Sequence, residues 1–166
     1  TGTGEKAFCA GVDLKDNTGK SGLDYWKHIS ADFSGIALRR TLKTPVIARV
    51  NGLALGGGLE MVMGCDIVVA ADTARFALPE AKVGRVPLDG GMVMLQRLIP
   101  RNIAVGMMMT GRMVLAPEMA RYGLLNAVVP MADLDAEVDE WVADILASAP
   151  LSVRAIKTLA RETSEM

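Results

Sequence analysis

The chain has 166 residues, of which 51% are hydrophobic and 22% are charged, and its formal net charge is −1. This length and composition allow a sizeable buried core, so we expect residues 1–166 to form a single globular domain. The near-neutral charge gives no electrostatic reason to expect nucleic acid or an anionic membrane surface as a partner.

The two cysteines, Cys9 and Cys65, have neither a metal-binding spacing nor the number needed for a disulfide framework. We expect both to be buried thiols in a reducing compartment. No hydrophobic segment of a signal peptide follows the polar start, which favours a cytoplasmic protein. Residues 53–71 are apolar, but Glu60 and Asp66 interrupt them, and a charge at the centre of a bilayer costs about 2.5–3.5 kcal/mol. We therefore expect no membrane span.

The chain opens with a short apolar run over residues 6–10 that ends at Gly11 and then turns polar. A glycine here permits a tight turn and a close approach of the backbone to a ligand, although an ordinary exit from a strand would look the same. Residues 29–42 have the spacing of a helix, which Pro45 ends. Because His28 is the only histidine, the sequence indicates neither a Ser/His/Asp triad nor a histidine-rich metal site, and we expect no metal.

The central stretch is an apolar run over residues 45–50, followed by the glycine triplet 56–58 and a helical pattern from Leu59. We expect a buried strand that turns into a helix whose start is cleared of side chains. The first N–H groups of a helix lack internal partners and carry partial positive charge, so this turn is a site for a developing oxyanion. Glu60 is the only charged residue between Arg49 and Asp66 and is therefore the first carboxylate to consider.

Short strands and helices alternate over the rest of the chain, which predicts an α/β layered domain. A glycine-containing loop over residues 84–91 separates two of these elements. Within it, Asp89 could face a cationic group of a ligand, but capping of the helix that begins near Gly90 is favoured. We expect strands over 66–71, 74–78 and 124–129, and helices over 92–99, 101–110, 116–122, from Leu134 with Asp133 as its cap, and over 151–165.

Two phosphate-binding motifs fail on these residues. No Gly-Lys-Ser/Thr follows the glycine triplet, and Leu14 stands where the run 19–21 would need the first glycine of a P-loop. The triplet also lacks the spacing of a dinucleotide fingerprint. What remains is an oxyanion held by two backbone N–H groups, with carboxylates moving protons beside it. Glu80 follows Glu60 by twenty residues, which is neither a helical nor a strand period, so only the tertiary fold can bring the two acids together.

In order and spacing, the residues resemble the enoyl-CoA hydratase/isomerase (crotonase) family over nearly the whole chain. The resemblance implies that the N–H groups of Val12 and Gly57 bind the thioester carbonyl and that Glu60 and Glu80 add or remove water. It also implies that Lys15 is suited to the phosphates of CoA. The matching segments are 7–14, 45–60, 65–66, 76–80 and 86–91. The implied substrate-binding residues are Ala10, Val12, Asp13, Leu14, Lys15 and Gly57.

The same resemblance implies a β-β-α superhelix assembled as a homotrimer or a dimer of trimers, acting on an acyl-CoA thioester without a separate cofactor. The family's first strands and its C-terminal helices have no counterpart in this sequence. Residues 1–4 look like a turn entered from a preceding strand. We therefore expect an incomplete chain.

Each glutamate also has a plainer explanation. An acid in the first turn of a helix often only complements the helix dipole, which would account for Glu60, and Glu80 could be a surface turn residue after Pro79. Because both fall on the family pattern, the catalytic interpretation is favoured. The activities left open are hydration or dehydration, double-bond isomerisation with one carboxylate, and binding without catalysis.

Overall fold

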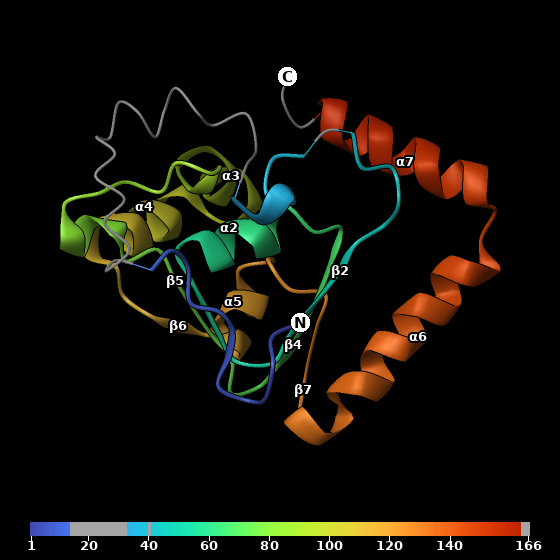
Figure 1. The fold of residues 1–166 in the computed structure, drawn as a ribbon, viewed down its shortest axis with the longest axis horizontal. Coiled ribbons are helices and arrows are strands. Elements are labelled where there is room, and N and C mark those ends of the chain that lie inside the picture. Colours follow the sequence, from blue (N-terminus) through green and yellow to red (C-terminus); the bar gives the residue numbers. More distant parts are fainter. Residues whose placement is uncertain (14–32, 40, 164–166) are drawn as a thin grey trace.

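The structure is a computed structural model that describes residues 1–13, 33–39 and 41–163. Its strands form a four-stranded sheet in the order β1-β3-β5-β6 and a three-stranded sheet in the order β2-β4-β7 (Figure 1). All neighbouring strands are parallel except β5 and β6. The strands are β1 (Ala7–Cys9), β2 (Ile47–Val50), β3 (Leu53–Leu55), β4 (Ile67–Ala71), β5 (Arg75–Ala77), β6 (Val114–Leu115) and β7 (Ala127–Val129).

Two successive segments of the chain repeat the same path. β2 and β3 are followed by helix α2 (Gly57–Met63), and β4 and β5 are followed by the 3-10 helix η2 (Glu80–Val83). β2 pairs with β4 in a register that joins residues twenty positions apart, such as Ile47 with Ile67, and β3 pairs with β5 in a register of twenty-two, such as Leu53 with Arg75. Each turn of the chain therefore adds one strand to each sheet and then a helical segment, which is a β-β-α superhelix.

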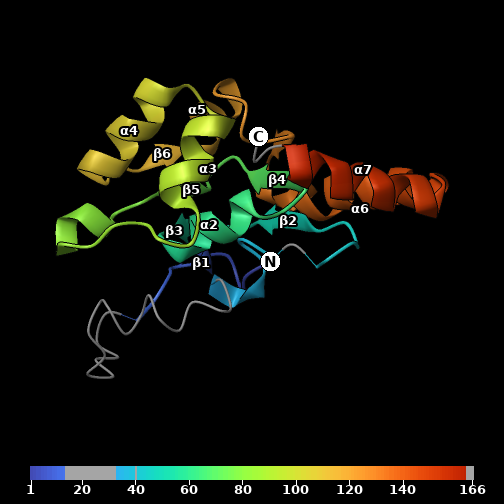
Figure 2. The same cartoon turned by 90° about the horizontal axis from the view of Figure 1, so that it is seen from above.

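Apolar side chains fill the space between the sheets and the helices. Helices α3 (Gly91–Leu98), α4 (Arg101–Thr110) and α5 (Ala116–Arg121) lie on the side of β5 opposite β1 (Figure 2). Phe76 of β5 is fully buried between them and the sheet, in one cluster with Leu59 and Leu95. The core therefore joins α2 and α3 to β5.

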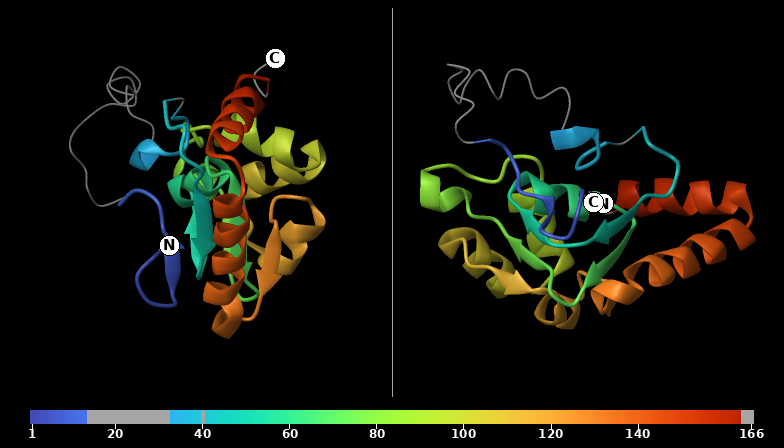
Figure 3. Two further views of the ribbon diagram at one scale, coloured as in Figure 1. Left: turned by 90° about the vertical axis from the view of Figure 1, so that its right-hand side faces the viewer. Right: turned by 60° about the horizontal axis from the view of Figure 1, so that its bottom comes forward.

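Helices α6 (Leu134–Ala147) and α7 (Pro150–Thr163) extend to one side of the sheets (Figures 1 and 3). Lys157 anchors α7 to the rest of the protein. It is 5% exposed, and its Nζ donates to Asp66 Oδ2 at 2.6 Å and to the carbonyl oxygen of Thr44 at 2.7 Å. Arg161 donates to the carbonyl oxygen of Gly64, at the C-terminal end of α2. None of the helices in the described ranges is long and apolar enough to cross a membrane.

The predicted helix over residues 29–42 is wrong where the structure describes it. Residues Phe33–Gly35 form a 3-10 turn in which Ser34 and Gly35 have φ values of 59° and 70°, and a right-handed helix cannot continue through them. This segment packs closely on α2 instead, since a Cβ on Gly64 would lie 2.6 Å from the Cα of Ala37. Residues 29–32 and 40 lie outside the described residues.

Two short strands, β3 and β6, are additional to the prediction, because three or two residues carry too little periodicity to indicate a strand. The other predicted strands and helices are present within a few residues of their expected ends. Asp133 occupies the N-cap position of α6, but its side chain makes no capping hydrogen bond. Cys9 and Cys65 are free thiols and only half-buried.

Candidate active site

The turn after β1 and the turn after β3 lie against one another. The two strands are parallel neighbours, so both end at the same edge of the sheet. Gly11 has a φ of 86°, and a Cβ added to it would lie 2.9 Å from the carbonyl oxygen of Leu55 and 3.5 Å from the nitrogen of Gly57. The N–H groups of Val12 and Gly57 therefore belong to two backbone turns in direct contact.

The glycines of the triplet are required by two different neighbours. Gly56 has a φ of 55°, which favours glycine, and a Cβ on it would lie 2.9 Å from Oε1 of Glu80. A Cβ on Gly58 would lie only 2.1 Å from the carbonyl oxygen of Cys9, so this position lets α2 approach β1 closely. Gly57 is the first residue of α2, where helix geometry supplies no acceptor for its N–H.

Glu60 projects from the first turn of α2 into the protein and is 3% exposed. Its Oε1 accepts a 2.8 Å hydrogen bond from the N–H of Gly91, the first residue of α3. Burial raises the pKa of Glu60 to about 7; the N–H of Gly91 opposes this rise, and the negative charges of Asp89 and Glu80 add to it. Near neutral pH this carboxyl group can therefore either hold or release a proton.

Glu80 begins η2, at the corresponding place one superhelical turn later. Its Oε1 lies against Gly56, and its Oε2 is buried without a hydrogen-bond partner among the described residues. Burial raises the pKa of Glu80, and its own backbone N–H lowers it. An unpartnered buried carboxylate oxygen is costly in a folded protein unless a ligand or water completes it, so this atom has unused capacity to accept a hydrogen bond.

The register of the sheets explains why the two glutamates lie together although twenty residues separate them. Val50 of β2 pairs with Ala70 of β4, and Leu55 of β3 pairs with Ala77 of β5, so one turn of the superhelix takes twenty to twenty-two residues here. Glu60 and Glu80 therefore follow equivalent strands in adjacent turns. The repeat of an apolar run, a short break and a second run before each glutamate is the sequence signal that could have shown this period.

Other residues expected in the site lie around the turn after β1. Ala10 and Asp13 are exposed, and the side chain of Val12 is 48% exposed beside the Gly57 turn. Leu14, Lys15 and His28 lie outside the described residues.

Asp89 departs from its expected role as a helix cap. Gly90, with a φ of 110°, is the N-cap residue of α3, and no side chain caps that helix. Asp89 is instead 5% exposed and close enough to Glu60 for its charge to raise the pKa of that carboxyl group, while its N–H acts in the opposite direction. The site thus contains a third acid, itself buried, that sequence reasoning placed at a helix end.

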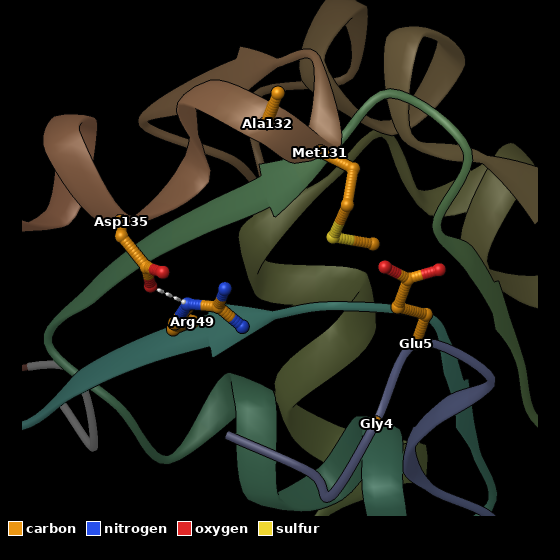
Figure 4. A pocket seen from close by; sticks show the side chains of 6 residues that line it. All are labelled: Gly4, Glu5, Arg49, Met131, Ala132 and Asp135. Atoms are coloured by element: carbon orange, nitrogen blue, oxygen red, sulfur yellow. Dashed lines mark hydrogen bonds and ion pairs between the residues drawn. The ribbon is translucent and has the colours of Figure 1, made fainter.

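An open hollow of about 520 Å³ lies elsewhere, between the first turn of the chain and the start of α6 (Figure 4). Its wall includes the ion pair between Arg49 and Asp135, whose closest atoms are 2.5 Å apart. None of its lining residues is a predicted site residue, so it plays no part in the chemistry below. The lining residues are Gly4, Glu5, Arg49, Met131, Ala132 and Asp135.

Two N–H groups at touching glycine turns, with the buried Glu60 and the half-buried Glu80 beside them, suit a reaction in which a carbonyl oxygen gains negative charge while protons move nearby. The profile of the enoyl-CoA hydratase/isomerase family matches residues 1–166, and the chain belongs to this family. The β-β-α superhelix described above is its crotonase fold, as structural neighbours with TM-scores near 0.86 confirm.

Among curated proteins, the chain is 44% identical over all 166 residues to the carnitinyl-CoA dehydratases of Shigella flexneri and Escherichia coli strain K12. Among solved structures, a carnitinyl-CoA dehydratase from Mycobacterium avium 104 has a TM-score of 0.86 and 38% identity, covering 96% of this chain and 62% of that one. An enoyl-CoA hydratase from Bacillus anthracis has a TM-score of 0.85 and 39% identity, covering 98% and 61%. The chain spans 63% of the length of the curated relatives.

Proposed function

We propose that the whole protein is an acyl-CoA hydratase or dehydratase that adds or removes water across the 2,3 bond of an enoyl-CoA thioester. The observation that carries this proposal is the pairing of Glu60, which is buried, with Glu80, whose Oε2 is buried, from successive superhelical turns beside a glycine-cleared helix start. Hydration needs one carboxylate to take a proton from water and one carboxyl group to deliver a proton to carbon, and two acids with raised pKa values suit both tasks.

In the proposed reaction, the thioester carbonyl lies between the N–H groups of Val12 and Gly57. Water oxygen bonds to C3 as the C2–C3 double bond moves toward the carbonyl, and the resulting enolate oxygen is stabilised by both N–H groups. A proton then adds to C2 and restores the thioester, so that one water molecule is added in all. The reverse sequence is dehydration. Losing one donor of this kind typically costs about 2.7–4 kcal/mol of transition-state stabilisation.

For the substrate, we propose a CoA thioester held along the turn after β1, with carnitinyl-CoA or crotonobetainyl-CoA as the first candidate acyl group. The relatives described as carnitinyl-CoA dehydratases support this choice. The half-exposed side chain of Val12 offers apolar surface to the thioester arm. The proposed contacts are Ala10, Val12, Asp13, Leu14, Lys15 and Gly57.

The same proposal includes a cytoplasmic homotrimer or dimer of trimers that needs no cofactor, because CoA is part of the substrate. Sedimentation of the whole protein would test the assembly. Turnover after exhaustive dialysis and with a chelator present would test the absence of a cofactor.

The proposed chemistry is tested by Glu60→Gln and Glu80→Gln in the whole protein, with hydration followed over a panel of enoyl-CoA thioesters that includes crotonobetainyl-CoA. Both variants are expected to lose about 10²–10⁴-fold in kcat, because each removes a proton-transfer group without changing side-chain size. Glu140→Gln, on an exposed position of α6, is the matched control and should retain full activity.

The outcomes separate hydration from the other activities of the family. Loss from only one of the two variants, together with movement of a double bond in place of water addition, would identify an isomerase. A wild-type protein that turns over none of the thioesters and gains no thermal stability from acyl-CoA would contradict an enzymatic role altogether.

A further inference from the structure

Asn51 is a fully buried amide between β2 and β3, and all of its hydrogen-bonding capacity is used. Its Oδ1 accepts from the N–H of Gly2 at 3.0 Å and from the hydroxyl of Thr1 at 3.3 Å. Its Nδ2 donates to the carbonyl oxygens of Gly4 at 2.6 Å and Ala7 at 3.2 Å. One side chain therefore closes the whole turn that leads into β1.

This turn lies at the start of the two strands that carry the proposed oxyanion donors. Ala7 is the first residue of β1, and β1 leads within three residues to Val12. Asn51 itself leads through Gly52 into β3, which ends beside Gly57. The amide therefore joins β1 to β3 at the end opposite the site.

The packing around the amide leaves little freedom for another arrangement. A Cβ on Gly52 would lie 2.5 Å from the carbonyl oxygen of Lys6, and one on Gly2 would lie 1.9 Å from that of Ala7. The N–H of Leu53 also donates to the carbonyl oxygen of Lys6 at 3.1 Å. In the short pairing of β1 with β3 the register shifts between Ala7 and Cys9, so regular strand pairing alone does not fix β1.

We propose that Asn51 is a positioning residue, whose amide fixes β1 relative to β3 and thereby sets the separation of the N–H groups of Val12 and Gly57. This inference rests on the proposed function, which requires both donors to act on one carbonyl oxygen. An amide is needed because two carbonyl oxygens and one N–H converge on it, and a carboxylate cannot donate to the carbonyl groups.

The test uses Asn51→Asp and Asn51→Ser in the whole protein. Aspartate has the size of asparagine but leaves Gly4 and Ala7 without a donor, whereas serine leaves space for water to replace part of the amide and is the milder change. A misplaced donor weakens binding of the enolate more than binding of the substrate. We expect kcat to fall about 10–100-fold with KM changed less than threefold.

A spectroscopic signal reports the two donors directly. The absorption band of an aryl-conjugated enoyl-CoA moves to longer wavelength when hydrogen bonds polarise its carbonyl group. We expect a clear shift on binding to the wild-type protein and a reduced shift in both Asn51 variants. Asn126→Ala is the matched control, because Oδ1 of Asn126 accepts a hydrogen bond from the N–H of Val68 in the other sheet. This substitution should lower stability without changing kcat or the spectral shift.

Variants at Asn51 that unfold at lower temperature but keep the wild-type kcat and spectral shift would overturn the inference, since the amide would then only stabilise the fold. If aspartate prevents folding, the serine variant decides by the same two measurements. A wild-type protein that binds the chromophore without a shift would overturn the proposed oxyanion site itself, and this result is distinguishable because it precedes any substitution.

Discussion

At the scale of single residues, the site brings buried acids together in surroundings that disfavour their charge. Glu60 is held by the N–H of Gly91 but lies among apolar neighbours and near two other carboxylates. Glu80 lies one turn away with one oxygen unpartnered. Burial is the main cause of the raised pKa of both Glu60 and Glu80, and the negative charges of Asp89 and Glu80 add to the rise at Glu60.

Asp89→Asn should lower the pKa of Glu60, because it removes a negative charge that opposes ionisation of this carboxyl group. A titration of ¹³C-labelled glutamate carboxyl groups, with the Glu60 signal identified by its absence in Glu60→Gln, would measure the change. Asp139→Asn, at an exposed position of α6, should leave the pKa unchanged. A Glu60 pKa that stays at about 7 in Asp89→Asn would show that the charge of Asp89 does not contribute to it.

Gly91→Ala should impair catalysis by moving Glu60. The added Cβ would lie 2.6 Å from Pro87 Cβ and 2.9 Å from Oε1 of Glu60, so the carboxyl group and the N–H that holds it cannot both keep their places. A displacement of this size is expected to lower kcat about 100-fold. Steady-state kinetics would measure the loss, and an unchanged kcat would mean that the Gly91 contact is dispensable.

Glu60 and the two glycine turns could be singled out from the sequence, because glycines in a turn and an acid in apolar surroundings are conspicuous, whereas Glu80 was predicted only because it falls on the family pattern. Asp89 was misassigned because an acid before a helix suggests a cap, whereas its burial depends on how the loop before α3 folds onto α2. The role of the Asn51 side chain was not predicted, since an Asn-Gly pair indicates a turn and does not indicate what the amide binds. The surroundings of Asp89 and Asn51 are both set by tertiary contacts, which local sequence patterns do not show.

At the scale of elements, close backbone approach is what places α2 beside β1. A glycine in a helix ordinarily weakens the helix, yet Gly58 is needed because the carbonyl oxygen of Cys9 lies where a Cβ would be. Sequence periodicity gave the longer helices and strands, whereas the segment over 33–39 could not be read because its path follows α2 and not a local pattern.

Gly58→Ala and Gly106→Ala should have opposite effects on stability. The first places a Cβ 2.1 Å from a backbone oxygen and is expected to destabilise the protein by about 1–3 kcal/mol. The second lies within α4 with nothing near its added Cβ and should stabilise the helix by up to about 1 kcal/mol. Denaturant unfolding of both variants would check the pair, and a stabilising Gly58→Ala would refute this account of the glycine triplet.

Lys157→Met should loosen α7 from the sheets. It removes the ammonium group that bonds to Asp66 and Thr44, and the expected loss is about 1–3 kcal/mol because Asp66 stays partly solvated. Arg154→Met makes the same change of charge at an exposed position of the same helix and should have little effect. Hydrogen exchange of α7 amides would locate the change, and equal protection in both variants would contradict it.

At the scale of the whole molecule, the repeat of the superhelix places the second acid beside the first. Consecutive turns are aligned by the parallel pairing of β2 with β4 and of β3 with β5. The strand pairing that forms the two sheets therefore also brings the residues of the site together. The α/β class and the order of elements followed from the sequence. The spacing of twenty to twenty-two residues between paired strands did not, because it is a property of strand pairing between segments and not of either segment.

Glu60→Gln should stabilise the protein at pH 8 and have little effect at pH 4. The pKa of Glu60 rises from 4.5 to about 7 on folding, so between these values the folded protein holds a proton that the unfolded chain releases, and stability falls as the pH rises. The full difference amounts to about 3 kcal/mol. Unfolding temperatures across pH 4–8 would measure it, and parallel curves for variant and wild type would contradict it.

Because Glu60 and Glu80 lie on successive turns of the superhelix, the proposed activity depends on both turns being folded. Neither Glu60 nor Glu80 is placed by its own segment alone, since each follows strands whose partners lie in the adjacent turn. Separation of either superhelical turn removes one of the two glutamates from the site and exposes the other to water. Under the proposed function, partial unfolding therefore leaves no half-active protein, and inactivation by denaturant should coincide with separation of the two superhelical turns even where much helical structure survives.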